Sequence, residues 1–269
     1  MNFEMRKFQN TVLHHWKENG RHTLPWRKTK DPYKILVSEV MLQQTQVERV
    51  IPYYERFIEK FPTVQKLAKS KLSDVLKIWS GLGYNRRAKY LHDVGRVIVE
   101  SNSGKFPKSF EDLRKLPGVG DYTARAVRVF AFDEPDVLME TNIRTVFTHY
   151  FFSTAQSISD KELIPLTLKA AEKKNPREWH WALMDYGAHL KRSGVRLNAK
   201  STHYTRQSPF EGSMRQMRGR LLRRLMDGPI TKNSFKKINA KNAYTISMAL
   251  NGMERDGLVV KEKGKWRIL

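Results

Sequence analysis

Glu39 is the residue whose surroundings most suggest chemistry. It falls in a run that predicts a helix, and its neighbours at helical spacing are Ile35, Leu36 and Leu42, so it lies on or beside an apolar face. A carboxyl withdrawn from water holds its proton longer than an exposed one, which suits a general acid. The same spacing also fits a glutamate on the helix margin that reaches solvent.

A second carboxylate, Glu140, stands near the predicted start of another helix, beside Thr141 and Asn142. A carboxylate at a helix N-terminus is often only a cap, so this position by itself assigns no catalytic role. The chain has no cysteine, and its eight histidines show no metal-ligand spacing. This excludes disulfides and zinc or iron–sulfur sites with cysteine ligands. We expect no bound metal, and catalysis must then use carboxylates, hydroxyls and amides.

A Gly-x-Gly turn joins two predicted helices within the run Leu116-Pro117-Gly118-Val119-Gly120-Asp121-Tyr122-Thr123-Ala124, and Ser109 and Asp112 form a capping pair before it. Glycine accepts positive φ without strain and lets another backbone approach closely. Unpaired N–H groups at the start of the second helix favour an anion, and in a basic protein the obvious anion is a nucleic-acid phosphate. A tight turn that only packs the core explains Gly-x-Gly equally well.

The chain carries 50 Lys and Arg against 27 Asp and Glu, a formal charge of +23 over 269 residues. A charge of this size implies a polyanionic partner, or a basic protein of the ribosomal or chromatin kind. The 40% hydrophobic residues and six tryptophans favour a compact fold over a basic tail. No apolar run approaches a membrane span, and residues 1–10 lack a signal-peptide core. We therefore expect a cytoplasmic protein, nucleoid-associated in a bacterial host.

Hydrophobic periodicity predicts helices throughout residues 1–190. The run Gly81-Leu82-Gly83-Tyr84 breaks this pattern, and its tyrosine either stacks on a base or plugs the surface. Arg86, Arg87 and Lys89 follow it as a phosphate patch or a solvated face. The predicted helices span residues 3–19, 32–46, 52–60, 63–69, 71–79, 86–100 and 109–115, then the stretch from the Gly-x-Gly turn to residue 131, one that opens within 137–146, and 160–174 and 177–190.

Residues 190–207 form a basic polar link, and we place a domain boundary near Ser208. The part that follows predicts a helix, a short strand or turn, two helices and a two-stranded hairpin that turns at residues 262–264. This is the layout of a winged helix, whose third helix can enter a DNA groove. The predicted elements span residues 215–226, 228–230, 234–238, 243–256, 258–260 and 265–269.

Four separated motifs, in the expected order, resemble a known family. The run 116–124 is similar to the helix-hairpin-helix of the endonuclease III superfamily of DNA base-excision glycosylases. Leu24-Pro25-Trp26-Arg27, Ser38–Val47 and Gly81–Tyr84 more specifically resemble its MutY-type adenine glycosylases. The resemblance covers about residues 22–190.

The resemblance implies an all-α, two-lobed helix-hairpin-helix glycosylase fold with a DNA-binding cleft, followed by the small α+β winged-helix-like module. The glycosylase domain would comprise residues 1–207, with a six-helix barrel at about 25–133 and a second lobe from 1–24 plus 134–207. The module would comprise residues 208–269. The implied partner is double-stranded DNA with a mismatched or oxidised base pair, and we expect a monomer without membrane attachment.

The resemblance also implies roles for the two carboxylates. Glu39 matches the catalytic acid that protonates N7 of adenine. Glu140 falls where the family has an aspartate that stabilises the sugar oxocarbenium ion or attacks its C1′. Asn142 and Tyr122 match supporting polar residues. Bifunctional members carry a lysine at the Tyr122 position for Schiff-base chemistry, which tyrosine cannot perform, so we expect a monofunctional enzyme.

Other matched positions contact the DNA. Gln44, Thr45 and Tyr84 match residues that wedge into the duplex beside the extruded base, and extrusion is needed because the glycosidic bond is unreachable in the stack. The hairpin matches the anchor for the DNA backbone and is a candidate site for a monovalent cation. The base-pocket and wedge set is Trp26, Arg27, Leu42, Gln43, Gln44, Thr45 and Tyr84; the hairpin set is Pro117, Gly118, Val119, Gly120 and Thr123.

Three departures from the family pattern bear on the substrate. Glu140 replaces the usual aspartate and places its carboxylate one methylene further out. The family's four-cysteine iron–sulfur loop should follow Gly187-Ala188, but the chain continues Leu190-Lys191-Arg192-Ser193 and holds no cysteine for such a cofactor. The family's C-terminal domain for 8-oxoguanine is replaced by the winged-helix-like module.

The resemblance therefore implies hydrolysis of the N-glycosidic bond of an adenine mispaired with 8-oxoguanine or guanine, which leaves an abasic site. A G·T or G·U mismatch thymine/uracil glycosylase of the same superfamily is one alternative, although Gln43-Gln44-Thr45 favours the adenine branch. A non-catalytic DNA-binding protein is the other. Glu39 together with Glu140 and Asn142 argues against it, because mere binding needs no buried carboxyl near phosphates.

Overall fold

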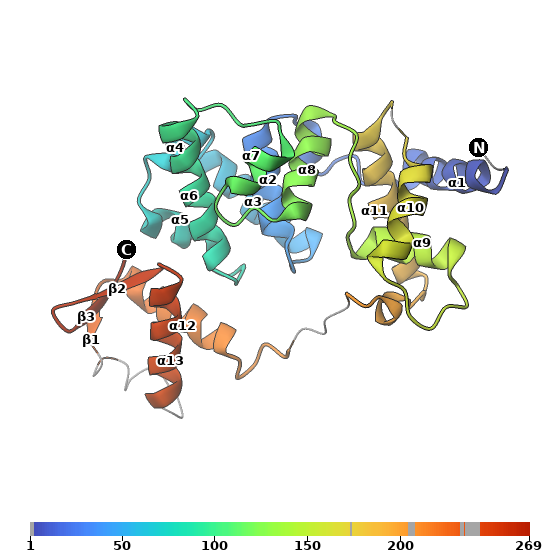
Figure 1. Cartoon of the computed structure of the whole chain (residues 1–269). Coiled ribbons are helices and arrows are strands. Elements are labelled where there is room, and N and C mark those ends of the chain that lie inside the picture. The colour runs from blue at the N-terminus through green and yellow to red at the C-terminus, as the bar shows by residue number, and fades with distance from the viewer. Residues whose placement is uncertain (1–2, 173, 204–207, 232–233, 235–242) are drawn as a thin grey trace. The chain divides into compact units, whose positions relative to one another are not determined.

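A computed structural model describes residues 3–172, 174–203, 208–231, 234 and 243–269 (Figure 1). The described chain is mostly helical, with its three-stranded sheet near the C-terminus, as the residue pattern predicts. The helices are α1 (Phe3–Asn19), η1 (Pro25–Lys28), α2 (Pro32–Leu42), α3 (Val47–Lys60), α4 (Val64–Ala68), α5 (Leu72–Trp79), α6 (Arg86–Ser101), α7 (Phe110–Lys115), α8 (Asp121–Phe132), α9 (Thr141–Phe151), α10 (Asp160–Ala170), α11 (Pro176–Arg192), η2 (Asn198–Lys200), α12 (Met214–Met226) and α13 (Ala243–Arg255).

The chain divides into two compact units. The first unit comprises Met1–Ile35, Lys108–Arg114 and Val119–Arg206. The second comprises Leu36–Pro107, Lys115–Gly118 and Gln207–Leu269. The boundaries of these units differ from those of the two predicted domains. The domain boundaries therefore stay a prediction.

The first unit packs around aromatic side chains. The ring of Phe8 in α1 lies 5.3 Å from that of Phe147 in α9 and 6.1 Å from that of Trp179 in α11. All three rings are buried. The three helices therefore share one apolar core, which brings the start of α9 and the end of α11 into the same unit.

The second unit contains a small helical core built by α3 to α6. Trp79 of α5 is fully buried, and its ring lies 6.2 Å from that of Phe57 in α3. A Cβ on Gly95 of α6 would stand 3.4 Å from Leu67, at van der Waals contact, so α4 and α6 pack closely at this position. This core carries the two loops that precede α3 and α6.

The C-terminal module belongs to the second unit and ends in an antiparallel sheet of order β1-β3-β2. Its strands are β1 (Ile230–Thr231), β2 (Val259–Glu262) and β3 (Lys265–Ile268). Lys263 and Gly264 turn the predicted hairpin with positive φ at both positions, which matches the twist of the flanking strands. The helix predicted at 234–238 lies outside the described residues, apart from Ser234.

Three helices differ from their predicted bounds by four residues or more. The helix expected to reach residue 46 ends at Leu42, because Gln44 adopts a left-handed backbone with φ 55° that a helix cannot continue. The helix expected at 52 starts at Val47, so Pro52 lies inside it. The helix expected to reach residue 174 ends at Ala170. Among the helices described, none is long and apolar enough to cross a membrane.

Candidate active site

Glu39 lies on α2 in the second unit. That helix begins where the Asp31 carboxylate accepts the backbone N–H of Tyr33 at 2.9 Å. Glu39 is 8% exposed, and Ile35 and Leu36 beside it are 1% exposed. The structure therefore places Glu39 among buried side chains rather than on a solvated margin, while its role as an acid stays a prediction.

Glu140 is the N-cap of α9 in the first unit. Its Oε1 accepts the backbone N–H groups of Asn142 at 2.7 Å and Ile143 at 2.8 Å, and its Oε2 accepts Nδ2 of Asn142 at 3.2 Å. Burial raises the pKa of Glu140, against the opposing effect of these hydrogen bonds and of the Lys191 and Arg144 charges. The start of α9 thus orients both carboxylate oxygens of Glu140. Glu140 therefore caps this helix, independently of any further role of its carboxylate.

Lys191 is a residue that the sequence reasoning did not place in the site. Its Nζ donates to Oδ1 of Asn142 at 2.7 Å, which continues the chain of contacts from Glu140. Burial lowers the pKa of Lys191, and the charge of Glu140 acts in the opposite direction. A Cβ on Gly187 would lie 2.3 Å from the Asn142 carbonyl oxygen, so α11 contacts the start of α9, and Lys191 follows Gly187 one turn later.

Trp26 and Arg27 lie on η1, and Trp26 is buried. Nη1 and Nη2 of Arg27 donate to the Asp185 carboxylate at 2.7 and 2.9 Å, and its guanidinium lies 5.1 Å from the ring centroid of Trp16. Burial raises the pKa of Asp185, but the hydrogen bonds and charges of Arg27 and Arg21 outweigh it, so the net pKa is below the usual value. These internal contacts position Arg27, and its contact with an extruded base stays a prediction.

Two residues of the predicted wedge carry left-handed backbones without being glycine. Gln44 has φ 55° and Tyr84 has φ 48°, while Gly81 and Gly83 of the second loop also have positive φ. Such conformations cost about 1–3 kcal/mol each and persist where surrounding contacts hold them. Contacts with the rest of the fold therefore determine the backbone of the 43–46 and 80–85 loops, rather than the conformational preferences of the loop residues themselves.

Arg87 is the side chain that holds these loops. Nη1 donates to the carbonyl oxygens of Gln43 at 2.6 Å and Val40 at 2.8 Å, and Nη2 donates to that of Gly83 at 3.2 Å. The residue is 8% exposed, and burial lowers its pKa to about 10, with Tyr84 acting in the opposite direction. Arg87 is neither a phosphate patch nor a solvated residue, which corrects the sequence interpretation: it satisfies carbonyls at the end of α2.

The hairpin between α7 and α8 shows why both glycines suit it. Gly118 has φ 70°, and a Cβ there would meet the ring of Tyr90 at 2.3 Å. Gly120, the N-cap of α8, is exposed, and a Cβ added to it would meet no described atom within 4 Å. Val119 and Thr123 are buried. The turn is thus packed on one side and open at Gly120, where another backbone can approach.

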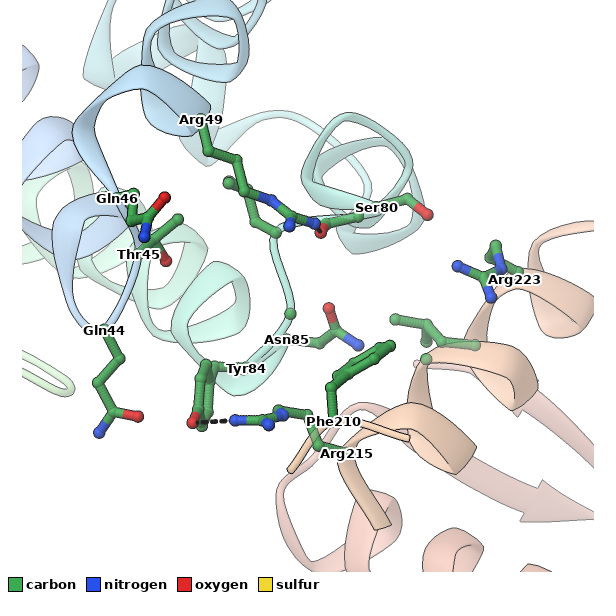
Figure 2. A pocket seen from close by; sticks show the side chains of 15 residues that line it. Gln44, Thr45, Gln46, Arg49, Ser80, Tyr84, Asn85, Phe210, Arg215 and Arg223 are labelled. Atoms are coloured by element: carbon green, nitrogen blue, oxygen red, sulfur yellow. Dashed lines mark hydrogen bonds between the residues drawn. The ribbon is translucent and has the colours of Figure 1, made fainter. Parts of the chain in front are cut away.

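The remaining predicted residues lie in or beside the hairpin and the wedge loops. Pro117 is partly exposed in the hairpin, and Tyr122 is partly exposed on the first turn of α8. Leu42 ends α2 and is partly exposed. Figure 2 shows that the second unit brings Gln44, Thr45 and Tyr84 together around a pocket of about 420 Å³.

Comparison with known proteins shows which family has this sequence and fold. The sequence profile of the HhH-GPD superfamily base excision DNA repair proteins matches residues 37–173. An adenine DNA glycosylase of Buchnera aphidicola subsp. Baizongia pistaciae is 39% identical over an alignment of 185 residues that covers 67% of this chain and 52% of that protein. An adenine DNA glycosylase of Mycolicibacterium smegmatis is 33% identical over an alignment of 263 residues that covers 91% of this chain and 90% of that protein.

Solved structures share the fold. A thermostable thymine-DNA glycosylase matches with a TM-score of 0.62 and 27% identity, over 75% of this chain and 96% of that one. An endonuclease III trapped as a covalent intermediate with DNA matches with a TM-score of 0.56 and 21% identity, over 78% and 92%. The fold is therefore that of the helix-hairpin-helix DNA glycosylases.

The chain belongs to the HhH-GPD superfamily of base excision DNA repair proteins. It spans about half the length of the Buchnera relatives that it matches. Its match to the Mycolicibacterium protein extends into the C-terminal module. The chain has no cysteine and so cannot hold an iron–sulfur cluster through cysteine ligands.

Proposed function

We propose that this protein is a DNA glycosylase that removes adenine mispaired with 8-oxoguanine or guanine. The observation that carries the proposal is the position of Glu39, a buried carboxyl on α2 shortly before the left-handed Gln44. The support from comparison is that relatives at 33–39% identity are adenine DNA glycosylases. The substrate is double-stranded DNA with a mismatched or oxidised base pair.

In the proposed reaction Glu39 donates a proton to N7 of the extruded adenine, so that the base leaves as a neutral molecule. General acid catalysis of this kind contributes about 10²–10⁴-fold. The Glu140 carboxylate, oriented by Asn142, stabilises the positive charge that develops on the sugar. Water then adds to C1′ and loses a proton, and the products are free adenine and an abasic site.

We further propose that the enzyme is monofunctional, because Tyr122 offers no amine for a Schiff base. The hairpin would hold the DNA backbone at Gly118 and Gly120, where an open turn precedes the N-terminus of α8. A monovalent cation bound at the hairpin would support the same contact.

A second candidate function is removal of thymine or uracil from mismatches with guanine. The observation that favours it is the likeness to a thymine-DNA glycosylase, the higher of the two TM-scores given above. Tyr122 is compatible with both functions, since both end at an abasic site.

The test is incubation with duplexes that carry A·oxoG, A·G, A·C, G·T or G·U, followed by alkali to cut abasic sites. Adenine release should disappear in Glu39→Gln and persist in Glu59→Gln, a matched change at an exposed residue of α3. Release of thymine or uracil alone would select the second function, and binding without any release would refute both. Borohydride should trap no covalent complex if the enzyme is monofunctional.

A further inference from the structure

Lys191 lies in the last turn of α11 and reaches the start of α9 within the first unit (Figure 1). Its Nζ donates to Oδ1 of Asn142 at 2.7 Å, and Nδ2 of the same amide donates to Oε2 of Glu140 at 3.2 Å. All three residues are partly exposed. A line of two hydrogen bonds therefore joins an ammonium group to the capping carboxylate, at a place that a substrate can reach.

The chemistry of the three groups determines the direction of the amide between them. A protonated lysine only donates hydrogen bonds, and an ionised carboxylate only accepts them, whereas an asparagine amide does both. If the Asn142 amide were turned over, its NH₂ group would face the ammonium of Lys191 and its oxygen would face the carboxylate of Glu140. Both contacts would then be repulsive, so Lys191 selects the orientation in which the amide donates to Glu140.

The other charged groups around Glu140 are paired with one another. Arg144 of α9 donates from Nε and Nη2 to the Asp160 carboxylate of α10, at 2.7 Å in both cases. His203 also lies against Asp160, at 3.6 Å. Among the described residues, no carboxylate forms an ion pair with Lys191. The charge of Arg144 is thus balanced by its own partner, whereas that of Lys191 acts toward Asn142 and Glu140.

We propose that Lys191 is a positioning residue, which holds the Asn142 amide so that it donates to Glu140 and favours the ionised carboxylate. The inference rests on the proposed function, in which that carboxylate stabilises the positive charge on the sugar. Burial raises the pKa of Glu140, and the Lys191 charge opposes this effect. Without Lys191 the amide is free to turn, and Glu140 keeps its proton to a higher pH.

The first test follows single-turnover adenine release from an A·G duplex against pH. The rate rises as Glu140 ionises, so Lys191→Met should move this acid limb to higher pH. At neutral pH and saturating enzyme the rate should fall about 10-fold, the rate equivalent of one hydrogen bond to a charged group. Lys169→Met removes the same charge from an exposed position on α10 and should leave the pH profile unchanged. An acid limb at the wild-type position in Lys191→Met would overturn the inference.

Two further variants test whether Lys191 acts through Asn142. In an Asn142→Ala background most of the rate loss from Lys191→Met should disappear, because the two residues act as one unit. The same fold loss in both backgrounds would overturn the inference. Lys191→Arg keeps a positive charge and several donors at a partly exposed position, so it should retain the wild-type acid limb even if Lys191→Met does not fold. A Lys191→Arg limb shifted to higher pH would count against the proposal.

A readout independent of catalysis separates this inference from the proposed function. The side-chain amide of Asn142 is hydrogen-bonded to Glu140, so its nitrogen chemical shift in an NMR titration reports the ionisation of that carboxyl. The midpoint should lie at higher pH in Lys191→Met than in the wild-type protein, and an unchanged midpoint would overturn the inference. If the wild-type protein releases no base from any duplex, the proposed function fails, and the titration still decides whether Lys191 favours the ionised Glu140.

Discussion

Replacing Arg87 by methionine tests whether this one buried guanidinium shapes both wedge loops. Methionine keeps most of the apolar stem and removes every donor. The carbonyl oxygens of Val40, Gln43 and Gly83 would then lose a charged partner in a place with little access to water. A hydrogen bond to a charged group contributes about 1.5–3 kcal/mol net.

The expected loss of stability follows from the two shortest contacts, at 2.6 Å to Gln43 and 2.8 Å to Val40. At the lower end of the range they contribute together about 3 kcal/mol. Relaxation of one left-handed residue, Gln44 or Tyr84, would return about 1 kcal/mol. We therefore expect Arg87→Met to lower the free energy of unfolding by about 2 kcal/mol.

Urea unfolding measures this change, and 2-aminopurine beside the target adenine reports base extrusion by its fluorescence. Extrusion should fall more than duplex affinity, because the phosphate contacts elsewhere are untouched. Arg96→Met on the same helix is the matched control: Arg96 is exposed and pairs with Glu100, so its loss should stay within about 0.5 kcal/mol. Equal midpoints and equal extrusion for Arg87→Met and wild type would refute the reasoning.

Three further results are expected. Glu140→Asp should keep measurable adenine release and Glu140→Gln should abolish it, whereas equal rates in a single-turnover assay would rule out a role for the charge. Gly187→Ala should destabilise the protein by about 1–3 kcal/mol in urea because its Cβ would meet the Asn142 carbonyl, while Gly252→Ala on α13, with open space, should not. Burial lowers the pKa of His180 to about 4; the unfolded chain therefore binds more protons between about pH 4 and 6.5, so stability should rise with pH across that window by up to about 3 kcal/mol. A His180→Gln variant should show a flatter profile, and an equally steep one would assign the slope to other groups.

The predictions from sequence succeeded where the cause is local. The capping pair at Ser109 and Asp112, with a 2.7 Å contact between their side chains, depends on residues three apart. The hairpin at Lys263 and Gly264 depends on two residues that tolerate positive φ. The apolar neighbours of Glu39 follow from helical spacing, which left a buried and a solvent-exposed position open, and the structure shows the buried one.

The predictions failed where the cause lies far along the chain. Arg87 was interpreted as a surface cation because its own helix offers no reason to bury it; its acceptors are carbonyls near residue 40. Lys191 was not placed in the site because its partner Asn142 lies on another helix. Periodicity shows which face of a helix is apolar, but it does not show which charged side chain a neighbouring element will enclose.

The sequence by itself therefore determined the helical elements, the basic charge, the lack of cysteine ligands and the residue types that could protonate a base or stabilise a cation. These depend on residue identity and on neighbours within a few positions. The tertiary structure alone decided that Arg87 is enclosed among the carbonyls of Val40, Gln43 and Gly83 and that Arg215 contacts the tyrosine of the wedge, Tyr84. Those contacts join segments distant in sequence, and their geometry is set by how the helices pack rather than by any local preference.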